Sequence, residues 1–179
     1  MNVSKIAVGK NPPWDVNVII EIPAGGAPIK YELDKESGTL FVDRFLHTAM
    51  FYPANYGFIP HTVSKDGDPM DALVLTRVPL MPGSVIQCRP LGVLMMEDEA
   101  GGDEKLIMVP VSSIDPYYDT TNTTEDIPLA LRNQIEHFFE HYKDLEKNKW
   151  VKIDTWKSAK DAALMIEAGI QAFKDSFVA

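Results

Sequence analysis

Three aspartates lie within six residues in the segment Asp66-Gly67-Asp68-Pro69-Met70-Asp71. Carboxylates this close together repel one another and raise each other's pKa unless a cation lies between them. Asp, Gly and Pro are also the usual residues of a solvent-exposed turn, so the segment taken alone fits a turn as well as a metal site. A calcium loop of the EF-hand type is excluded, because Asp71 stands at its glycine position and Arg77 at its final glutamate position.

A second acidic cluster surrounds the tight turn Gly101-Gly102, with Asp98 and Glu99 before it and Asp103 after it. Its ordinary interpretation is a charged loop. Because Asp98 and Asp103 flank a tight turn, both side chains are also able to face one point. Oxygen ligands in such numbers suit Mg²⁺ or Mn²⁺, which retain water and bridge to phosphate oxygens.

Charged side chains of both signs also occur on the predicted strands. Alternation places Lys30 and Glu32 on one face of their strand, and Glu21 lies on the strand before it. Such residues on successive strands indicate either a solvated outer face or a pocket. The cations that suit an anion with spread charge are Lys30, Arg44, Lys105 and Lys143.

Two tyrosines have two alternative interpretations, either as side chains that pack in the core or as side chains that contact a ligand. Tyr56 lies in residues 50–60, an aromatic segment that lacks clean periodicity and is expected to be a core-lining loop. Tyr142 continues the apolar face of a predicted helix, which favours a core-facing ring with its hydroxyl at the edge of a site. A tyrosine hydroxyl is able to donate to a ligand, so both residues are candidates.

The sequence His137-Phe138-Phe139-Glu140-His141 matches the H-x-x-E-H pattern of some zinc peptidases. Zinc needs a third protein ligand, and the apolar stripe of the predicted helix leaves both histidines at its margin. The single cysteine, Cys88, makes a four-thiolate zinc site and an intramolecular disulfide impossible. We therefore interpret the two histidines as part of a helix-packing or subunit face.

A fold that begins with strands must position these residues. Period-two alternation or short apolar runs predict strands over residues 16–22, 29–33, 40–46, 72–76, 85–89, 92–97 and 105–111. The last two flank the Gly101-Gly102 turn as a hairpin. From Ile127 the apolar spacing becomes three and four, which predicts a helix over about 126–147.

A second helix is predicted over about 159–177, and it begins at a capping box formed by Ser158 and Asp161. Its apolar stripe ends at Phe177. Strands followed by helices, without alternation between them, indicate an α+β fold that is mainly β. The length of 179 residues suits a single domain over 1–179, with its barrel or sheet at about 12–111.

The composition narrows the class of protein. With 17 Lys and Arg against 26 Asp and Glu, the net charge is −9, which disfavours a general nucleic-acid binder. The densest lysine cluster, at 143–152, is interpreted as a solvated helix end. No apolar run approaches the length that spans a bilayer, and the N-terminal residues show no long apolar stretch after the first charge. The sequence thus predicts a cytoplasmic protein without a membrane partner.

The order and spacing of these motifs resemble the family I soluble inorganic pyrophosphatases of the bacterial type. The resemblance covers about residues 12–156, and one departure from it is Thr155, where many relatives have glycine. It is carried by Glu21-Ile22-Pro23, Lys30-Tyr31-Glu32, Asp43-Arg44, Tyr52-Pro53, Asn55-Tyr56-Gly57, Asp66 to Asp71, Asp98 to Lys105 and His137 to Lys143. The implied fold is an OB-like five-stranded barrel with two flanking helices.

The resemblance implies hydrolysis of inorganic pyrophosphate to two phosphates with several Mg²⁺ ions, or with Mn²⁺ or other divalent ions. The nucleophile would be a metal-bridged hydroxide, with Asp68 as its general base. The implied metal ligands are Asp66, Asp71, Asp98 and Asp103, with Glu21, Glu32 and Glu99 nearby or acting through water. The implied contacts to phosphate oxygens are Lys30, Arg44, Tyr56, Lys105, Tyr142 and Lys143.

The implied assembly is a homohexamer, in which His137 and His141 fit a subunit face that protonation loosens. Two other classes of function stay open at this point. A divalent-ion binding module would use the same carboxylates without releasing phosphate. An OB-type nucleic-acid binder would bind oligonucleotides with a steep salt dependence. Phosphate transfer to an organic acceptor is a weaker alternative, since the sequence contains no nucleotide-binding P-loop motif.

Overall fold

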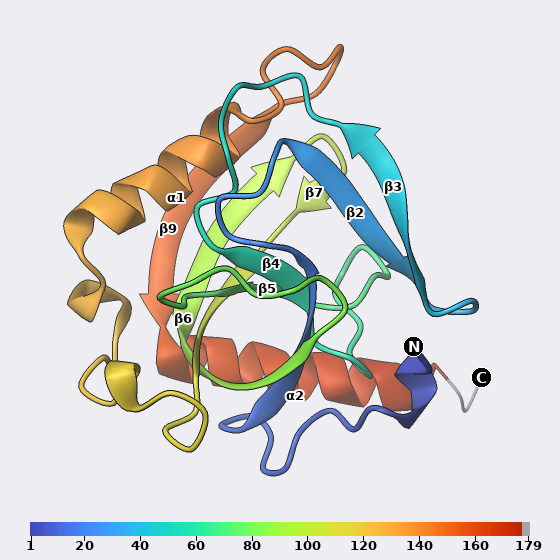
Figure 1. The fold of residues 1–179 in the computed structure, drawn as a ribbon, viewed down its shortest axis with the longest axis vertical. Coiled ribbons are helices and arrows are strands. Elements are labelled where there is room, and N and C mark those ends of the chain that lie inside the picture. Colours follow the sequence, from blue (N-terminus) through green and yellow to red (C-terminus); the bar gives the residue numbers. More distant parts are fainter. Residues whose placement is uncertain (177–179) are drawn as a thin grey trace.

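A computed structural model describes residues 1–176 as a mainly β molecule with two α-helices (Figure 1). Five strands form a closed ring, since β6 pairs with both β8 and β1. In ring order they are β1 (Val16–Ile22), β4 (Asn55–Phe58), β5 (Asp71–Val74), β8 (Lys105–Pro110) and β6 (Val85–Asp98). Neighbours in the ring are antiparallel except β5 and β8, which run parallel.

Two more strands extend the sheet and two helices cover it. Strand β9 (Val151–Ser158) pairs with β6, and the short β7 (Gly101–Gly102) pairs with the end of β6. Helix α1 (Leu129–His141) lies along β9, and α2 (Ala159–Asp175) runs across β6 below the ring in Figure 1. Among residues 1–176, neither of these helices nor any other is long and apolar enough to cross a membrane.

A separate two-stranded sheet stands beside the ring in Figure 1. It consists of β2 (Ile29–Asp34) and β3 (Thr39–Phe45), with Lys30 opposite Arg44. Its base rests on a small apolar cluster that includes Leu33 and Phe58. The remaining helical elements are three short 3-10 turns at Val3–Lys5, Pro116–Tyr118 and Thr124–Asp126.

The ring strands bury residues in two apolar clusters. The cluster against α2 includes Val18, Ile20, Leu106, Met108 and Ile166. The cluster against α1 includes Leu73, Leu94, Ile107, Phe138 and Phe139. Leu106 and Met108 face one cluster and Ile107 the other, which is the alternation that a strand requires. Burial on both faces therefore fixes the ring as a rigid platform for the polar residues at its open end.

Most of the predicted strands are confirmed with ends that differ by one or two residues. The strands predicted at 85–89 and 92–97 are a single strand, because a register shift between Pro90 and Gly92 allows β6 to continue past the proline. The predicted hairpin is confirmed, since β6 pairs antiparallel with β7 and β8, but its turn lies at residues 99–100, because Gly101 and Gly102 themselves form β7.

The expectation of a loop throughout residues 50–60 is wrong, because residues 55–58 form β4. All four residues of this strand are buried, so no alternation of polar and apolar residues marks it. Gly57 allows the strand to form. A Cβ at Gly57 would lie 1.9 Å from the carbonyl oxygen of Ile19 on β1.

The first helix ends earlier than predicted, at His141 instead of about Lys147. The apolar spacing continues beyond the helix because Tyr142 is buried against Phe138, whereas Leu145 is 75% exposed. The chain then turns and forms β9, which the sequence analysis did not predict.

Helix α2 begins at the predicted capping box. The Asp161 amide donates to the Ser158 hydroxyl at 3.2 Å, and the Ser158 amide donates to the Asp161 carboxylate at 3.0 Å. The last residue of the predicted stripe, Phe177, lies outside the described residues.

Candidate active site

A cavity of about 460 Å³ opens between the ring, the β2–β3 sheet and the segment that follows α1. All fourteen site residues predicted from the sequence line this cavity. Its acidic residues are Glu21, Glu32, Asp66, Asp68, Asp71, Asp98, Glu99 and Asp103, and its basic residues are Lys30, Lys35, Arg44, Lys105, Lys143 and Lys149. Tyr56 and Tyr142 complete the predicted set.

Lys105 lies at the buried end of this cavity, with a side chain that is only 4% exposed. Its Nζ is 2.6 Å from the Asp71 carboxylate and also donates to Asp103. The parallel pairing of β5 with β8 sets Ala72 opposite Leu106 and so brings Asp71 beside Lys105. Burial lowers the pKa of Lys105, but the two carboxylates outweigh burial and raise the pKa well above its usual value. Lys105 is therefore a permanent cation.

Asp66 and Asp68 lie on the turn that precedes β5. The Asp68 amide donates to the Asp66 carboxylate at 3.0 Å, and the Ser64 amide donates to the Asp68 carbonyl at 2.7 Å. Gly67 between them has a φ of 93°, a conformation that favours glycine. The Asp68 side chain is 79% exposed, and its carboxylate lies 3.7 Å from Lys35. The turn thus presents a water-accessible carboxylate at the edge of the cavity.

Glu21 is the buried carboxylate of the cavity, with 7% of its surface exposed. Its Oε1 accepts a hydrogen bond from the Leu33 amide at 2.7 Å, which ties β1 to β2. Burial raises the pKa of Glu21 to about 7, although the bond from Leu33 acts in the opposite direction. Asp71 and Glu32 also raise the pKa of Glu21, whereas Lys30 lowers it, so a further cation close to Glu21 would favour its charged form.

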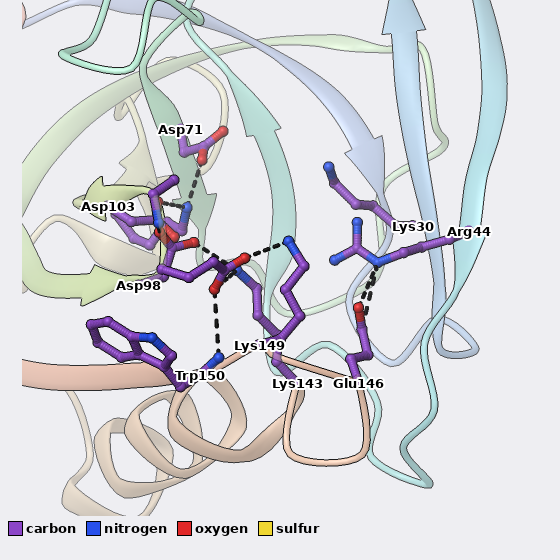
Figure 2. A network of polar contacts seen from close by, with 12 residues as sticks. Lys30, Arg44, Asp71, Asp98, Asp103, Lys143, Glu146, Lys149 and Trp150 are labelled. Atoms are coloured by element: carbon purple, nitrogen blue, oxygen red, sulfur yellow. Dashed lines mark hydrogen bonds and ion pairs between the residues drawn. The ribbon is translucent and has the colours of Figure 1, made fainter.

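The segment after α1 closes one side of the cavity (Figure 2). Lys143 is 7% exposed on its side chain, and its Nζ donates to Asp98 at 2.7 Å. Lys149 forms an ion pair with Glu99, and the Trp150 amide donates to the same carboxylate at 3.5 Å. Burial raises the pKa of Asp98, but the hydrogen bonds from Lys143 and the Ala100 amide and the charges of Lys143 and Lys105 together outweigh burial and lower the pKa. This segment is thereby tied to the tip of the β6 hairpin.

The β2–β3 sheet supplies two cations from the other side. The Lys30 Nζ contacts Glu32 and lies 3.5 Å from Asp43. Arg44 donates from Nη1 to Asp43 at 2.8 Å, and its Nε lies 3.2 Å from Glu146. In Figure 2 both cations extend from this sheet toward the opposite wall. The cavity is therefore lined by cations on two sides and by carboxylates between them.

Tyr56 and Tyr142 both line the cavity while their rings remain buried, each with 8% of its surface exposed. The Tyr142 ring stacks on Phe138 with centroids 5.2 Å apart, and the Lys105 Nζ lies 5.6 Å from the Tyr56 centroid. Burial raises the pKa of both hydroxyls. Both tyrosines therefore keep their protons and are available as hydrogen-bond donors.

Three residues of this charge network were not predicted from the sequence: Lys35, Glu146 and Lys149. Lys149 belongs to the lysine cluster that we interpreted as a solvated helix end. That interpretation is wrong for Lys143 and Lys149, because α1 ends at His141 and the chain turns back over the cavity. No local pattern singles out Lys35 or Glu146, whose partners lie far away in the sequence.

The chemistry of the donors fits a hard divalent cation, because the carboxylates of the cavity offer oxygen ligands. Within residues 1–176, the side-chain positions bring no three His, Cys, Asp or Glu residues close enough together to hold a metal ion by themselves. Ammonium groups stand beside the carboxylates instead, with Lys105 between Asp71 and Asp103. A bound cation would share these carboxylates with the lysines.

The two histidines of the H-x-x-E-H sequence lie away from this cavity. Their ring centroids are 4.7 Å apart on α1. The His141 ring lies 2.9 Å from Asp144 and 3.6 Å from Glu140. His137 lines a separate, open apolar pocket together with Phe51. Both histidines thus lie on an outer face of the helix, as the sequence indicates.

Comparison with known proteins matches residues 18–174 to the family described as inorganic pyrophosphatase. An inorganic pyrophosphatase of Rhodospirillum rubrum is 62% identical over 173 residues, covering 96% of each chain. One of Caulobacter vibrioides is 58% identical over 177 residues, covering 99% of this chain and all of that protein. A solved inorganic pyrophosphatase structure from Coxiella burnetii superposes with a TM-score of 0.91 at 50% identity, covering 94% of this chain and 99% of that one.

Proposed function

This chain belongs to the bacterial inorganic pyrophosphatase family and is an enzyme that hydrolyses inorganic pyrophosphate, and from that premise we propose that the cavity described above is its active site. The observation that carries the proposal is the interleaving of eight carboxylates with six cationic side chains around one space. Pyrophosphate is a compact polyanion, so its hydrolysis requires cations both on the substrate and where charge develops. This cavity offers cationic side chains directly, and its carboxylates offer oxygen ligands for metal cations.

Pyrophosphatases of this family generally depend on divalent metal ions. We assign Asp66, Asp71, Asp98 and Asp103 as ligands of several Mg²⁺ ions, with Mn²⁺ or other divalent ions as substitutes. Glu21, Glu32 and Glu99 would act nearby or through water. Divalent ions held there would neutralise the charge of the substrate and would lower the pKa of a bound water.

Asp68 is the proposed general base. Its side chain is 79% exposed at the edge of the cavity, so it meets water directly. In this role a carboxylate oxygen of Asp68 takes the proton of the water that attacks phosphorus. The turn that carries Asp68 is fixed by its own hydrogen bonds, which keeps the acceptor in place while the proton moves.

The remaining predicted residues bind and polarise the phosphate groups. Lys105 and Lys143 are almost fully buried and charged in their ion pairs, so their ammonium groups are positioned before substrate arrives. Lys30 and Arg44 approach from the opposite side of the cavity. Tyr56 and Tyr142 donate from hydroxyls that keep their protons. Together these donors would stabilise the charge that builds on the leaving phosphate.

Phosphate release from pyrophosphate, measured with and without Mg²⁺, tests the assignment. We expect Mg²⁺-dependent release that Asp71→Asn abolishes and that Asp154→Asn, an exposed carboxylate of β9, leaves unchanged. Undiminished phosphate release by the Asp71→Asn variant would contradict the assignment of this cavity as the active site. Mg²⁺ binding without release by the unaltered chain would favour an ion-binding module, and salt-sensitive oligonucleotide binding would favour a nucleic-acid binder.

The proposal extends to the whole protein. We infer a single domain over 1–179 whose five-stranded ring is an OB-like barrel, and which works in the cytoplasm as a homohexamer. The closed order of the ring strands supports the barrel. The outward-facing His137 and the 59% exposed Phe51, which line one open pocket, support a subunit face on α1.

A further inference from the structure

Glu146 lies outside the predicted site, yet it contacts one of the cavity's cations at close range (Figure 2). Its side chain is only 11% exposed. The two carboxylate oxygens lie 3.2 Å and 3.5 Å from the Nε of Arg44, although 102 positions separate the two residues in the chain. A carboxylate this well covered and this close to a guanidinium holds it in one orientation.

The contacts of Arg44 leave one corner of its guanidinium available. Nε faces Glu146, and Nη1 donates to Asp43 at 2.8 Å. In the part of the chain that the structure describes, the third nitrogen, Nη2, has no hydrogen-bond partner. Arg44 lines the cavity. Burial lowers the pKa of Arg44, but Glu146 and Asp43 outweigh it and hold the pKa above its usual value. The guanidinium is therefore charged and held at two corners.

Glu146 also connects two parts of the fold. Arg44 belongs to the β2–β3 sheet, which forms no ladder with the ring. A two-stranded sheet alone is poorly fixed in space. Glu146 belongs to the segment after α1, which is anchored to the ring strand β6 by Lys143 on Asp98 and by Lys149 on Glu99. The contact between Arg44 and Glu146 therefore adds a connection between the β2–β3 sheet and the ring.

We propose that Glu146 is a positioning residue for pyrophosphate hydrolysis, which orients Arg44 so that Nη2 meets a phosphate oxygen. This inference rests on the proposed role of Arg44 in phosphate binding. A long side chain that is already held loses less conformational freedom when it binds its ligand. Glu146 itself touches neither substrate nor metal in this role, and acts only through the guanidinium.

The test is a double-mutant cycle between Glu146→Gln and Arg44→Ala, read as kcat, KM and the affinity for inorganic phosphate. We expect Glu146→Gln to lower kcat/KM roughly 10- to 100-fold, as misplaced binding groups do, and to weaken phosphate binding in the same direction. In the Arg44→Ala background the same change should alter kcat/KM less than about twofold, because the group that Glu146 positions is gone. Glu146→Asp should recover part of the loss.

The control is Glu140→Gln, an exposed carboxylate at the end of α1 whose neighbour is His141, and it should match the unaltered enzyme. Equal, multiplicative effects of Glu146→Gln with and without Arg44 would overturn the inference, since they would indicate a purely structural role. A lowered kcat/KM for Arg44→Ala together with a normal kcat/KM for Glu146→Gln would overturn this inference but not the phosphate-binding role of Arg44. A normal Arg44→Ala would overturn both this inference and the phosphate-binding role of Arg44.

Discussion

At the scale of single residues, the carboxylates of the cavity differ most in how far protein surrounds them. The Asp68 side chain is 79% exposed, whereas Glu21 is 7% exposed and has its pKa raised to about 7 by burial. An exposed carboxylate exchanges protons with water readily. A buried carboxylate gains most from a neighbouring cation. The two extremes therefore suit the two tasks that hydrolysis needs, proton transfer and charge balance around metal.

Replacing Asp68 with Asn tests the first of these tasks. The amide keeps the shape of the side chain but cannot accept the proton of the attacking water. We expect turnover at saturating Mg²⁺ to fall by roughly 10²- to 10⁴-fold, the usual effect of losing a general base. Mg²⁺ binding, measured by calorimetry, should be largely intact. Turnover close to that of the unaltered enzyme would remove Asp68 from this role.

Glu21 makes the stability of the metal-free protein depend on pH. Its pKa is about 7 in the fold against an ordinary value of 4.5, so between these values the folded state binds more protons than the unfolded chain. The free energy of unfolding should therefore fall as pH rises from 4.5 to 7, by up to about 3 kcal/mol. Glu21→Gln should flatten this decline. Urea unfolding in chelator at pH 5 and pH 8 provides the measurement, and parallel decline in both proteins would contradict the prediction.

The identity of the cavity's residues was predictable because local motifs carry them, and the order of these motifs along the chain resembles that of a known family. The partner of each residue was not predictable, because it depends on pairing between distant strands. Lys105 meets Asp71 only because β5 and β8 run parallel. Glu146 meets Arg44 only because the helix stops at His141. Charge pairing within the site is thus a property of the fold.

At the scale of elements, alternation and short apolar runs predicted most strands, including the fully buried β8, and missed β4 and β9. Strand β4 shows no alternation because all of its residues are buried. Strand β9 lies after a helix and was overlooked, although Val151 and Ile153 alternate with polar residues there. The helix was extended too far because Tyr142 packs in the core from a turn and thereby continues the apolar spacing. Tertiary packing decided the cases of β4 and Tyr142, whereas β9 carries the expected alternation.

Gly57 tests how tightly β4 must pack for the site to form. A Cβ there would meet the Ile19 carbonyl oxygen at 1.9 Å, and β4 cannot move away because it pairs with β1 and β5. Gly57→Ala should lower the free energy of unfolding by roughly 1–3 kcal/mol or more and disturb the neighbouring Tyr56. Gly102→Ala is the matched control, since its Cβ meets nothing closer than 3.7 Å. Equal urea midpoints for the two variants would refute the tight approach.

At the scale of the whole molecule, the net charge of −9 belongs mainly to surface outside the cavity. The cavity's eight carboxylates face six cations, two of which, Lys35 and Lys149, the sequence analysis had not placed there. The site is therefore close to neutral before any metal binds. Added divalent ions would make it locally positive while the rest of the surface stays acidic. Attraction for a polyanion then depends on metal loading, since the chain as a whole repels anions.

The proposed hexamer makes a prediction at this same scale, because His137 and His141 lie on the outer face of α1 with ring centroids 4.7 Å apart. Protonation of both imidazoles would place like charges side by side on the proposed subunit face. The acids beside His141, Glu140 and Asp144, are exposed and offset only part of this repulsion.

We therefore expect light scattering to give a hexamer mass at pH 8 and a smaller mass at pH 5. Replacing both histidines with glutamine should keep the larger mass at both pH values, because the amide carries no charge at either. An unaltered chain that stays hexameric from pH 8 to pH 5 would count against a role for these histidines in the interface. A chain that is monomeric even at pH 8 would remove the hexamer itself.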